Sequence, residues 1–80
     1  MARVPPRSSC EIEDLLSYHG FHFDRAGKKG HDLWAPPLPG RPVLVPRNRR
    51  SGGIPEGTVR AILREAGISR EDALAFWGIG

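Results

Sequence analysis

An amphipathic segment in the second half of the chain constrains the fold more than any other feature. Its apolar side chains recur at the i, i+3, i+4 and i+7 spacing of a helix, at Val59, Ile62, Leu63 and Ala66. Pro55 suits the first turn of such a helix and Gly67 suits its end. Because the whole chain has only 80 residues, this helix must share one thin core with the rest. The sequence therefore predicts one small domain built around a helix over 55–66.

A first helix is predicted over 9–19. Ser8 and Glu11 have the spacing of a capping box, and Gly20 supplies the left-handed position that ends a helix. Apolar residues again fall at helical spacing, at Ile12, Leu15 and Leu16. A short third helix is predicted after Ser69, with an apolar face at Ala73, Leu74, Phe76 and Trp77.

Three short segments between the first two helices predict strands. Residues 21–25 alternate apolar and polar as a half-buried strand does, and residues 31–35 and 41–45 are also extended in pattern. Residues 27–30 and 36–40 are rich in Gly and Pro and predict a turn and a loop. Pro42 cannot donate to a sheet ladder, so the third strand should lie at an edge or begin with Pro42.

The predicted fold class is α+β: a two-layer α-β-β-β-α sandwich with a three-stranded antiparallel meander, both helices on one sheet face, and a short C-terminal helix. Residues 1–7 are expected to be a disordered tail and residues 8–80 the domain. The side chains expected to be largely buried are Leu15, Leu16, Val43, Val45, Ile62 and Leu63.

Charge is distributed unevenly along the chain. The formal net charge is +3, but residues 25–64 hold nine Lys or Arg against two acids, which leaves +7 in the middle. Such a segment suits a polyanion such as nucleic acid, although basic solvated surface is equally compatible with it. The single cysteine, Cys10, excludes an intramolecular disulfide framework and a cysteine-rich zinc site. With no secretory signal and no membrane-spanning run, a cytoplasmic location is expected.

His31 is the candidate catalytic residue. It stands at the start of a predicted strand, directly after a turn that contains Lys28 and Lys29. A histidine exchanges protons near neutral pH, and adjacent lysines can hold a phosphate and stabilise its developing charge. Metal-free RNA cleavage needs little more, because the nucleophile can be the 2′-hydroxyl of the RNA. A basic turn followed by a histidine also occurs by chance in many domains.

Other candidate residues have structural interpretations. His19 and His22 lie on either side of the helix stop at Gly20 and cannot share a helical face as metal ligands, so no metal site is expected. They are interpreted as a helix-end histidine and an outward strand histidine. Trp34 is interpreted as a core residue, with base stacking as the alternative. A second basic group either binds phosphate or is merely solvated; it comprises Arg47, Arg49 and Arg50.

Four segments resemble the HicA family of bacterial toxins. Residues 13–21 (Glu-Asp-Leu-Leu-Ser-Tyr-His-Gly-Phe) are similar to its opening helix, and residues 29–34 (Lys-Gly-His-Asp-Leu-Trp) to its histidine segment. Residues 43–46 (Val-Leu-Val-Pro) resemble its third strand, and residues 57–68 (Gly-Thr-Val-Arg-Ala-Ile-Leu-Arg-Glu-Ala-Gly-Ile) its second helix. The similarity covers about residues 9–70. Lys29 and Gly30 stand where the family has Gly-Ser before the histidine.

The resemblance implies a fold like the double-stranded-RNA-binding domain, an mRNA endonuclease activity that needs no cofactor, and a HicB-like antitoxin partner. The family's essential histidine corresponds to His31. Three hypotheses remain open at this point: a metal-independent endoribonuclease, a non-catalytic RNA-binding module, and a domain whose basic face docks an acidic protein. Strict alternation places His31 on the sheet face of Leu33, and Asp32 on that of Trp34, but leaves open which face the helices cover.

Overall fold

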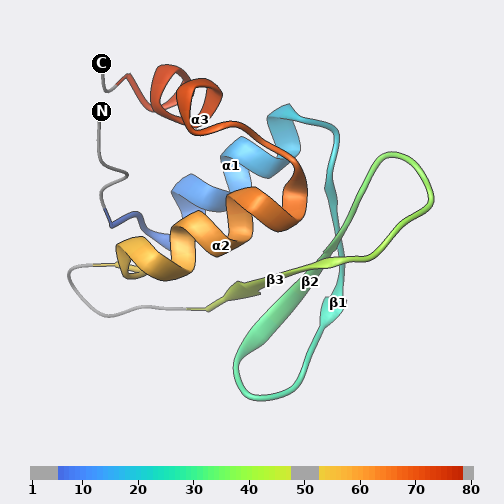
Figure 1. Cartoon of the computed structure of the whole chain (residues 1–80). Coiled ribbons are helices and arrows are strands. Elements are labelled where there is room, and N and C mark those ends of the chain that lie inside the picture. Colours follow the sequence, from blue (N-terminus) through green and yellow to red (C-terminus); the bar gives the residue numbers. More distant parts are fainter. Residues whose placement is uncertain (1–5, 48–52, 79–80) are drawn as a thin grey trace.

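The structure is a computed structural model that describes residues 6–47 and 53–78. Its elements follow in the order α1 (Ser9–Tyr18), β1 (His22–Ala26), β2 (His31–Ala35), β3 (Val43–Pro46), α2 (Glu56–Ala66) and α3 (Arg70–Phe76). Figure 1 shows α1 and α2 together on one side of the sheet and α3 beside α1. The predicted α+β class, with a three-stranded antiparallel sheet and a short C-terminal helix, is confirmed.

The ends of α1 are fixed by the residues that the sequence indicates. The Ser8 hydroxyl accepts a hydrogen bond from the Glu11 amide at 3.2 Å, and the Glu11 carboxylate accepts one from the Ser8 amide at 3.0 Å. This reciprocal pair is the predicted capping box. At the other end the helix stops at Tyr18, one residue earlier than expected, and His19 serves as its C-cap. Gly20 then takes a φ of +90°, which glycine adopts without a side-chain clash.

The sheet is a meander in the order β1-β2-β3 with both pairings antiparallel. Its second strand matches the predicted residues 31–35, whereas the third begins at Val43 and extends to Pro46. Pro42 precedes that strand, in keeping with its missing N–H. In the β2–β3 register His31 pairs with Pro46 and Leu33 with Leu44.

The prediction of a half-buried first strand is wrong. Every residue of β1 is exposed, and the strand covers His22–Ala26 instead of 21–25. The two helices pack chiefly against β3, so β1 lies beyond the layer that they bury. A bulge between Phe23 and Arg25 also shifts the register with β2, which breaks the period-two alternation on which the prediction rested. Phe21 packs against the core from just outside the strand.

The core lies between the two helices and the face of β2 and β3 that they cover (Figure 1). All six side chains that the sequence placed there are buried, namely Leu15, Leu16, Val43, Val45, Ile62 and Leu63. Trp34 is buried with them, which confirms its interpretation as a core residue. Its indole N–H has no hydrogen-bond partner within the described residues, and its ring meets that of Phe23 edge-on.

The last helix is brought back over the first by a sharp turn at Gly67, whose φ is +73°. The Ile68 amide donates to the Leu63 carbonyl at 2.9 Å, and Ile68 is itself buried, as in a helix end closed by an apolar contact. The predicted cap Ser69 then accepts a hydrogen bond from the Asp72 amide and begins α3.

Contacts with the domain begin at Arg7, inside the segment that the sequence analysis assigned to a tail. Arg7 and Ile54 exchange backbone hydrogen bonds, and the Arg7 guanidinium pairs with Glu11 at 2.6 Å. The same guanidinium lies 5.3 Å from the centre of the Trp77 ring, whose indole N–H donates to the Glu11 carbonyl. Residues 1–5 of the expected tail lie outside the described residues.

Candidate functional site

His31 is the first residue of β2, and its side chain lies on the sheet face away from the helices. Asp32 and Trp34 are buried toward α1 and α2, so the alternation of the strand turns His31 and Leu33 the other way. We call this side of the sheet the open face. It carries His31, Leu33 and Ala35 of β2 and Leu44 of β3, which pairs with Leu33. The packing thus settles the face of His31, which alternation alone left undecided.

The imidazole of His31 is held by a single contact. Its Nδ1 lies 3.1 Å from the backbone carbonyl oxygen of Lys29. A carbonyl can only accept, so this contact requires a proton on Nδ1 and leaves Nε2 as the nitrogen with the free lone pair in the neutral ring. Within the described residues Nε2 has no hydrogen-bond partner. The ring is half-buried, which leaves Nε2 in a position to exchange a proton with a bound molecule.

The turn before His31 presents two exposed lysines. The Gly27 amide donates to the His31 carbonyl at 2.7 Å and closes the β1–β2 hairpin. A Cβ on Gly27 would lie 3.0 Å from the His31 carbonyl oxygen, a tight approach that glycine avoids. Lys29 and Gly30 both have positive φ, +58° and +74°. The left-handed conformation costs a residue such as Lys29 roughly 1–2 kcal/mol, and the turn keeps it beside His31 nonetheless.

Arg47 lies at the same end of β2 as His31, but its side chain is directed toward the helix-covered face of the sheet, where Asp32 lies. Its amide donates to the Gly30 carbonyl at 2.8 Å, and its Nε lies 3.3 Å from the carboxylate of Asp32. The structure therefore brings three predicted phosphate-binding residues to the end of the sheet that carries His31: Lys28, Lys29 and Arg47. The guanidinium of Arg47 is partly engaged by Asp32. Arg49 and Arg50, the other two predicted contacts, lie outside the described residues.

Asp32 is a site residue that the sequence analysis did not single out. It is only 9% exposed, and a buried carboxylate needs a counterion, which Arg47 provides. Glu13 of α1 lies close enough to interact with it. Burial, first, and repulsion from Asp32 and Asp14 raise the pKa of the Glu13 carboxyl above its ordinary value. The strand alternation, which puts Asp32 on the same face as Trp34, could have indicated from the sequence that Asp32 is buried. Its pairing with Arg47 could not be predicted, because it depends on the register between β2 and β3.

The remaining histidines take the places predicted for them, at a helix end and exposed on a strand, and both lie away from His31. His19 is the C-cap of α1, and His22 is an exposed residue of β1 that pairs with Ala35, at the far end of β2 from His31. In residues 6–47 and 53–78 no three His, Cys, Asp or Glu side chains are grouped so that they could hold a metal ion. Nor does the described part of the chain contain a helix long and apolar enough to cross a membrane.

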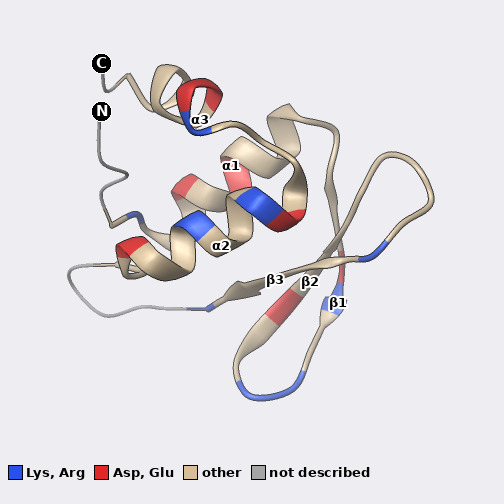
Figure 2. Cartoon of the chain, viewed as in Figure 1, with Lys and Arg blue, Asp and Glu red and all other residues tan. Residues whose placement is uncertain are grey.

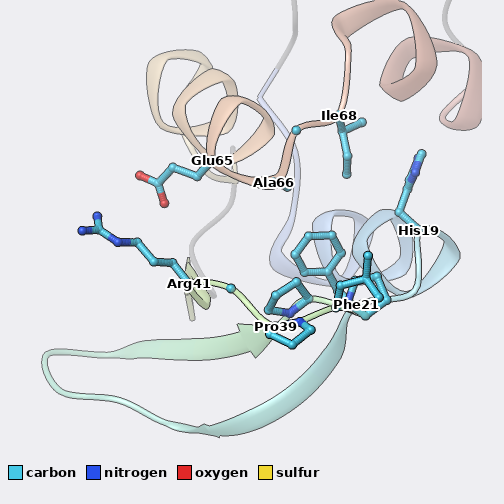
Figure 3. A pocket seen from close by; sticks show the side chains of 12 residues that line it. His19, Phe21, Pro39, Arg41, Glu65, Ala66 and Ile68 are labelled. Atoms are coloured by element: carbon cyan, nitrogen blue, oxygen red, sulfur yellow. The ribbon is translucent and has the colours of Figure 1, made fainter.

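A hollow of about 420 Å³ lies at the end of the molecule opposite the β1–β2 turn. It is lined mainly by the loop that follows β2, together with His19 and Phe21 on one side and Glu65 on another. Figure 3 shows the side chains of His19 and Glu65 on different sides of this hollow and not directed at one another. The hollow therefore offers no acid–base pair, and His31 remains the better catalytic candidate.

These features define a class: a small basic α+β domain with a solvent-accessible histidine and two lysines at one end of its sheet. Among known families, the model described as HicA toxin of bacterial toxin-antitoxin matches residues 9–68. The chain belongs to the HicA toxin family of bacterial toxin–antitoxin systems. Comparisons with curated proteins and with solved structures gave no match. The helix α3 lies beyond the matched residues.

Proposed function

We propose that this toxin is a metal-independent mRNA endonuclease in which His31 transfers the proton. HicA toxins are mRNA interferases, and the observation that carries the proposal for this chain is the position of His31. It lies on the open face beside Lys28 and Lys29, with Nε2 free of any described partner. An RNA strand placed across this end of the sheet can therefore meet a proton acceptor and two cations together.

The chemistry follows from these groups and from the substrate itself. The 2′-hydroxyl of the RNA attacks the adjacent phosphorus, its proton passes to a base, and the 5′-oxygen leaves as its bond to phosphorus breaks. The free lone pair on Nε2 suits His31 to take the first proton, and the resulting imidazolium can return a proton to the leaving oxygen. Lys28 and Lys29 stabilise the charge on the phosphoryl oxygens. No metal is needed to generate the nucleophile, because the substrate supplies it.

A specific observation favours a second candidate, a non-catalytic RNA-binding module. Within the described residues no second acid or base is bonded to His31, whose contact is the Lys29 carbonyl. A single proton-transfer group makes a weaker catalyst than a pair, whereas the same basic turn would bind RNA without cleaving it.

Cleavage in the presence of EDTA separates the two candidates. We expect the purified protein to cleave single-stranded RNA at the same rate with EDTA as with Mg²⁺, because the nucleophile and the proton carrier need no metal. The rate is measured on an end-labelled RNA, with the 2′-O-methyl analogue as the control that lacks the nucleophile. Binding of the unmodified RNA without cleavage under both conditions would support the binding module instead.

A toxin of this family implies a cognate antitoxin. The finer proposal is that a HicB-like antitoxin covers His31. The open face offers it apolar side chains next to the catalytic candidate, since Leu44 is exposed and Leu33 half-exposed on that face. The neighbouring cations also suit an acidic partner that competes with RNA.

We therefore expect the antitoxin complex to protect the open face. The measurement is hydrogen exchange of the toxin alone and in complex, read at residues 27–33 and 43–46, together with RNA cleavage by the complex. Slower exchange in these segments and loss of cleavage are expected. Unchanged exchange there in a complex that nevertheless blocks cleavage would show that inhibition works by another route.

A further inference from the structure

A second concentration of positive charge lies far along the chain from His31. A hollow of about 320 Å³ opens between the second half of α2 and the beginning of α3. Its floor is apolar, formed by Leu63 and Ile68, and three arginines surround it together with one acid. The charged residues of this basic hollow are Arg60, Arg64, Arg70 and Glu71.

Local structure explains why the three arginines meet. Val59, Ile62 and Leu63 face the core, so Arg60 and Arg64, one turn apart, lie on the exposed side of α2. Figure 2 shows Lys or Arg positions along α2 and at the start of α3. The left-handed turn at Gly67 reverses the chain and returns Arg70 toward the same side. A Cβ at Gly67 would meet no atom, so its φ of +73° alone favours glycine there. The three arginines therefore meet only because α2 ends at Gly67.

The charges do not cancel. Glu71 contributes one negative charge, and the carboxyl end of α2 contributes about half of one through the helix dipole. Even without Arg70, the two guanidinium groups of Arg60 and Arg64 exceed this negative charge, so the hollow keeps a positive excess. Neither Arg60 nor Arg64 forms an ion pair with another described residue. Arg64 lies in the last turn of α2, where a cation also stabilises the helix. Helix stabilisation is therefore a structural reason for an arginine at position 64.

We propose that the basic hollow binds phosphate groups of the RNA strand at a site separate from His31. This inference rests on the proposed function, because it takes RNA to be the substrate. Planar guanidinium groups bind phosphate oxygens in pairs, which suits a site formed by arginine rather than lysine. Arg60 and Arg64 are four residues apart, about 6 Å along the helix axis, so two guanidinium groups on one side of α2 can bind neighbouring phosphates of one strand.

The position of the basic hollow indicates that it contributes to the binding of long RNA and not to bond cleavage. It belongs to the helical layer, whereas His31 lies on the opposite side of the sheet. The molecule measures 32 × 29 × 17 Å along its principal axes, so an RNA strand of about 16 nucleotides, roughly 54 Å at 3.4 Å per nucleotide, can pass around its edge and reach both sites. A dinucleotide contacts only the His31 end. The basic hollow should therefore lower the KM of long RNA and leave the cleavage of a dinucleotide unchanged.

The test measures the affinity for a 2′-O-methyl RNA of about 16 nucleotides, the upper site size of small single-strand-binding folds. This RNA cannot be cleaved, and its affinity is followed by fluorescence anisotropy as KCl increases. For single strands the slope of log K against log [KCl] changes by about 0.7 for each phosphate contact. We expect the slope to fall by about 0.7 in Arg64→Gln and by about 1.4 in the Arg60→Gln/Arg64→Gln double variant.

Arg41→Gln is the matched control, because Arg41 is an exposed arginine that lines the other hollow and carries the same charge. A slope for Arg64→Gln no lower than that of Arg41→Gln overturns the proposal, even if its melting temperature falls, because a purely structural role moves stability and not the salt slope. Loss of polyglutamate binding with unchanged RNA binding in the double variant also overturns it, in favour of an acidic protein. Dinucleotide cleavage by the wild type and the double variant, run in parallel, tests the proposed function independently.

Discussion

His31→Ala should reduce RNA cleavage by about 10²–10⁴-fold, the usual contribution of a proton-transfer group. The fold should survive, because the side chain lies half-buried on the open face and its one hydrogen bond goes to the Lys29 carbonyl. Two backbone hydrogen bonds close the hairpin: the Gly27 amide donates to the His31 carbonyl, and the His31 amide donates to the Lys28 carbonyl. Neither involves the imidazole. The measurement is cleavage of an end-labelled RNA in EDTA, with circular dichroism to confirm folding.

The other two histidines are the controls. His19 caps α1 and His22 pairs with the far end of β2, so His19→Ala and His22→Ala should retain most of the activity. Growth arrest on expression should be lost with His31→Ala and kept with both controls. A folded His31→Ala protein that cleaves as fast as the wild type would mean that another group transfers the proton, and the mechanism proposed here would be wrong.

The parts of the fold that were predictable from sequence are those set by local signals. The capping box of Ser8 and Glu11 and the left-handed glycines Gly20 and Gly67 act within a few residues, and each lies where the sequence indicates, although α1 ends one residue early. The first strand was not predictable in this way. Its alternating pattern presupposes a covered face, but the helices cover β3 and β2 instead, and the bulge after Phe23 changes the register.

In the candidate site, too, features set by local sequence were predictable and features set by tertiary structure were not. The position of His31 after a lysine turn is evident in the sequence, but its exposure on the open face follows only once Asp32 and Trp34 are known to face the helices. The pairing of Asp32 with Arg47 joins residues that lie fifteen apart and requires the strand register. The three arginines of the basic hollow likewise converge only because the chain reverses at Gly67.

Leu16→Ala should lower the free energy of unfolding by about 2–5 kcal/mol, the range for leucine truncated in a core. Leu16 is 0% exposed and belongs to the cluster that joins α1 to the sheet and to α2. A domain of this length has roughly 4–12 kcal/mol of stability in total, so the loss is a large share of it. A small domain loses about 4–8 °C of melting temperature per kcal/mol, so a fall of at least about 8 °C is expected.

The matched control is Leu44→Ala, which removes the same atoms from a side chain that is 50% exposed on the open face. Its cost should stay below about 1 kcal/mol, because half of that apolar surface already meets water. Urea unfolding compares the two variants, and an unchanged slope against urea identifies a change of stability rather than of the unfolded state. Equal losses for Leu16→Ala and Leu44→Ala would contradict the helix-covered face as the core. A larger loss for Leu16→Ala would instead identify the helix-covered face as the one that holds the domain together, and the open face as free for the RNA and antitoxin contacts proposed above.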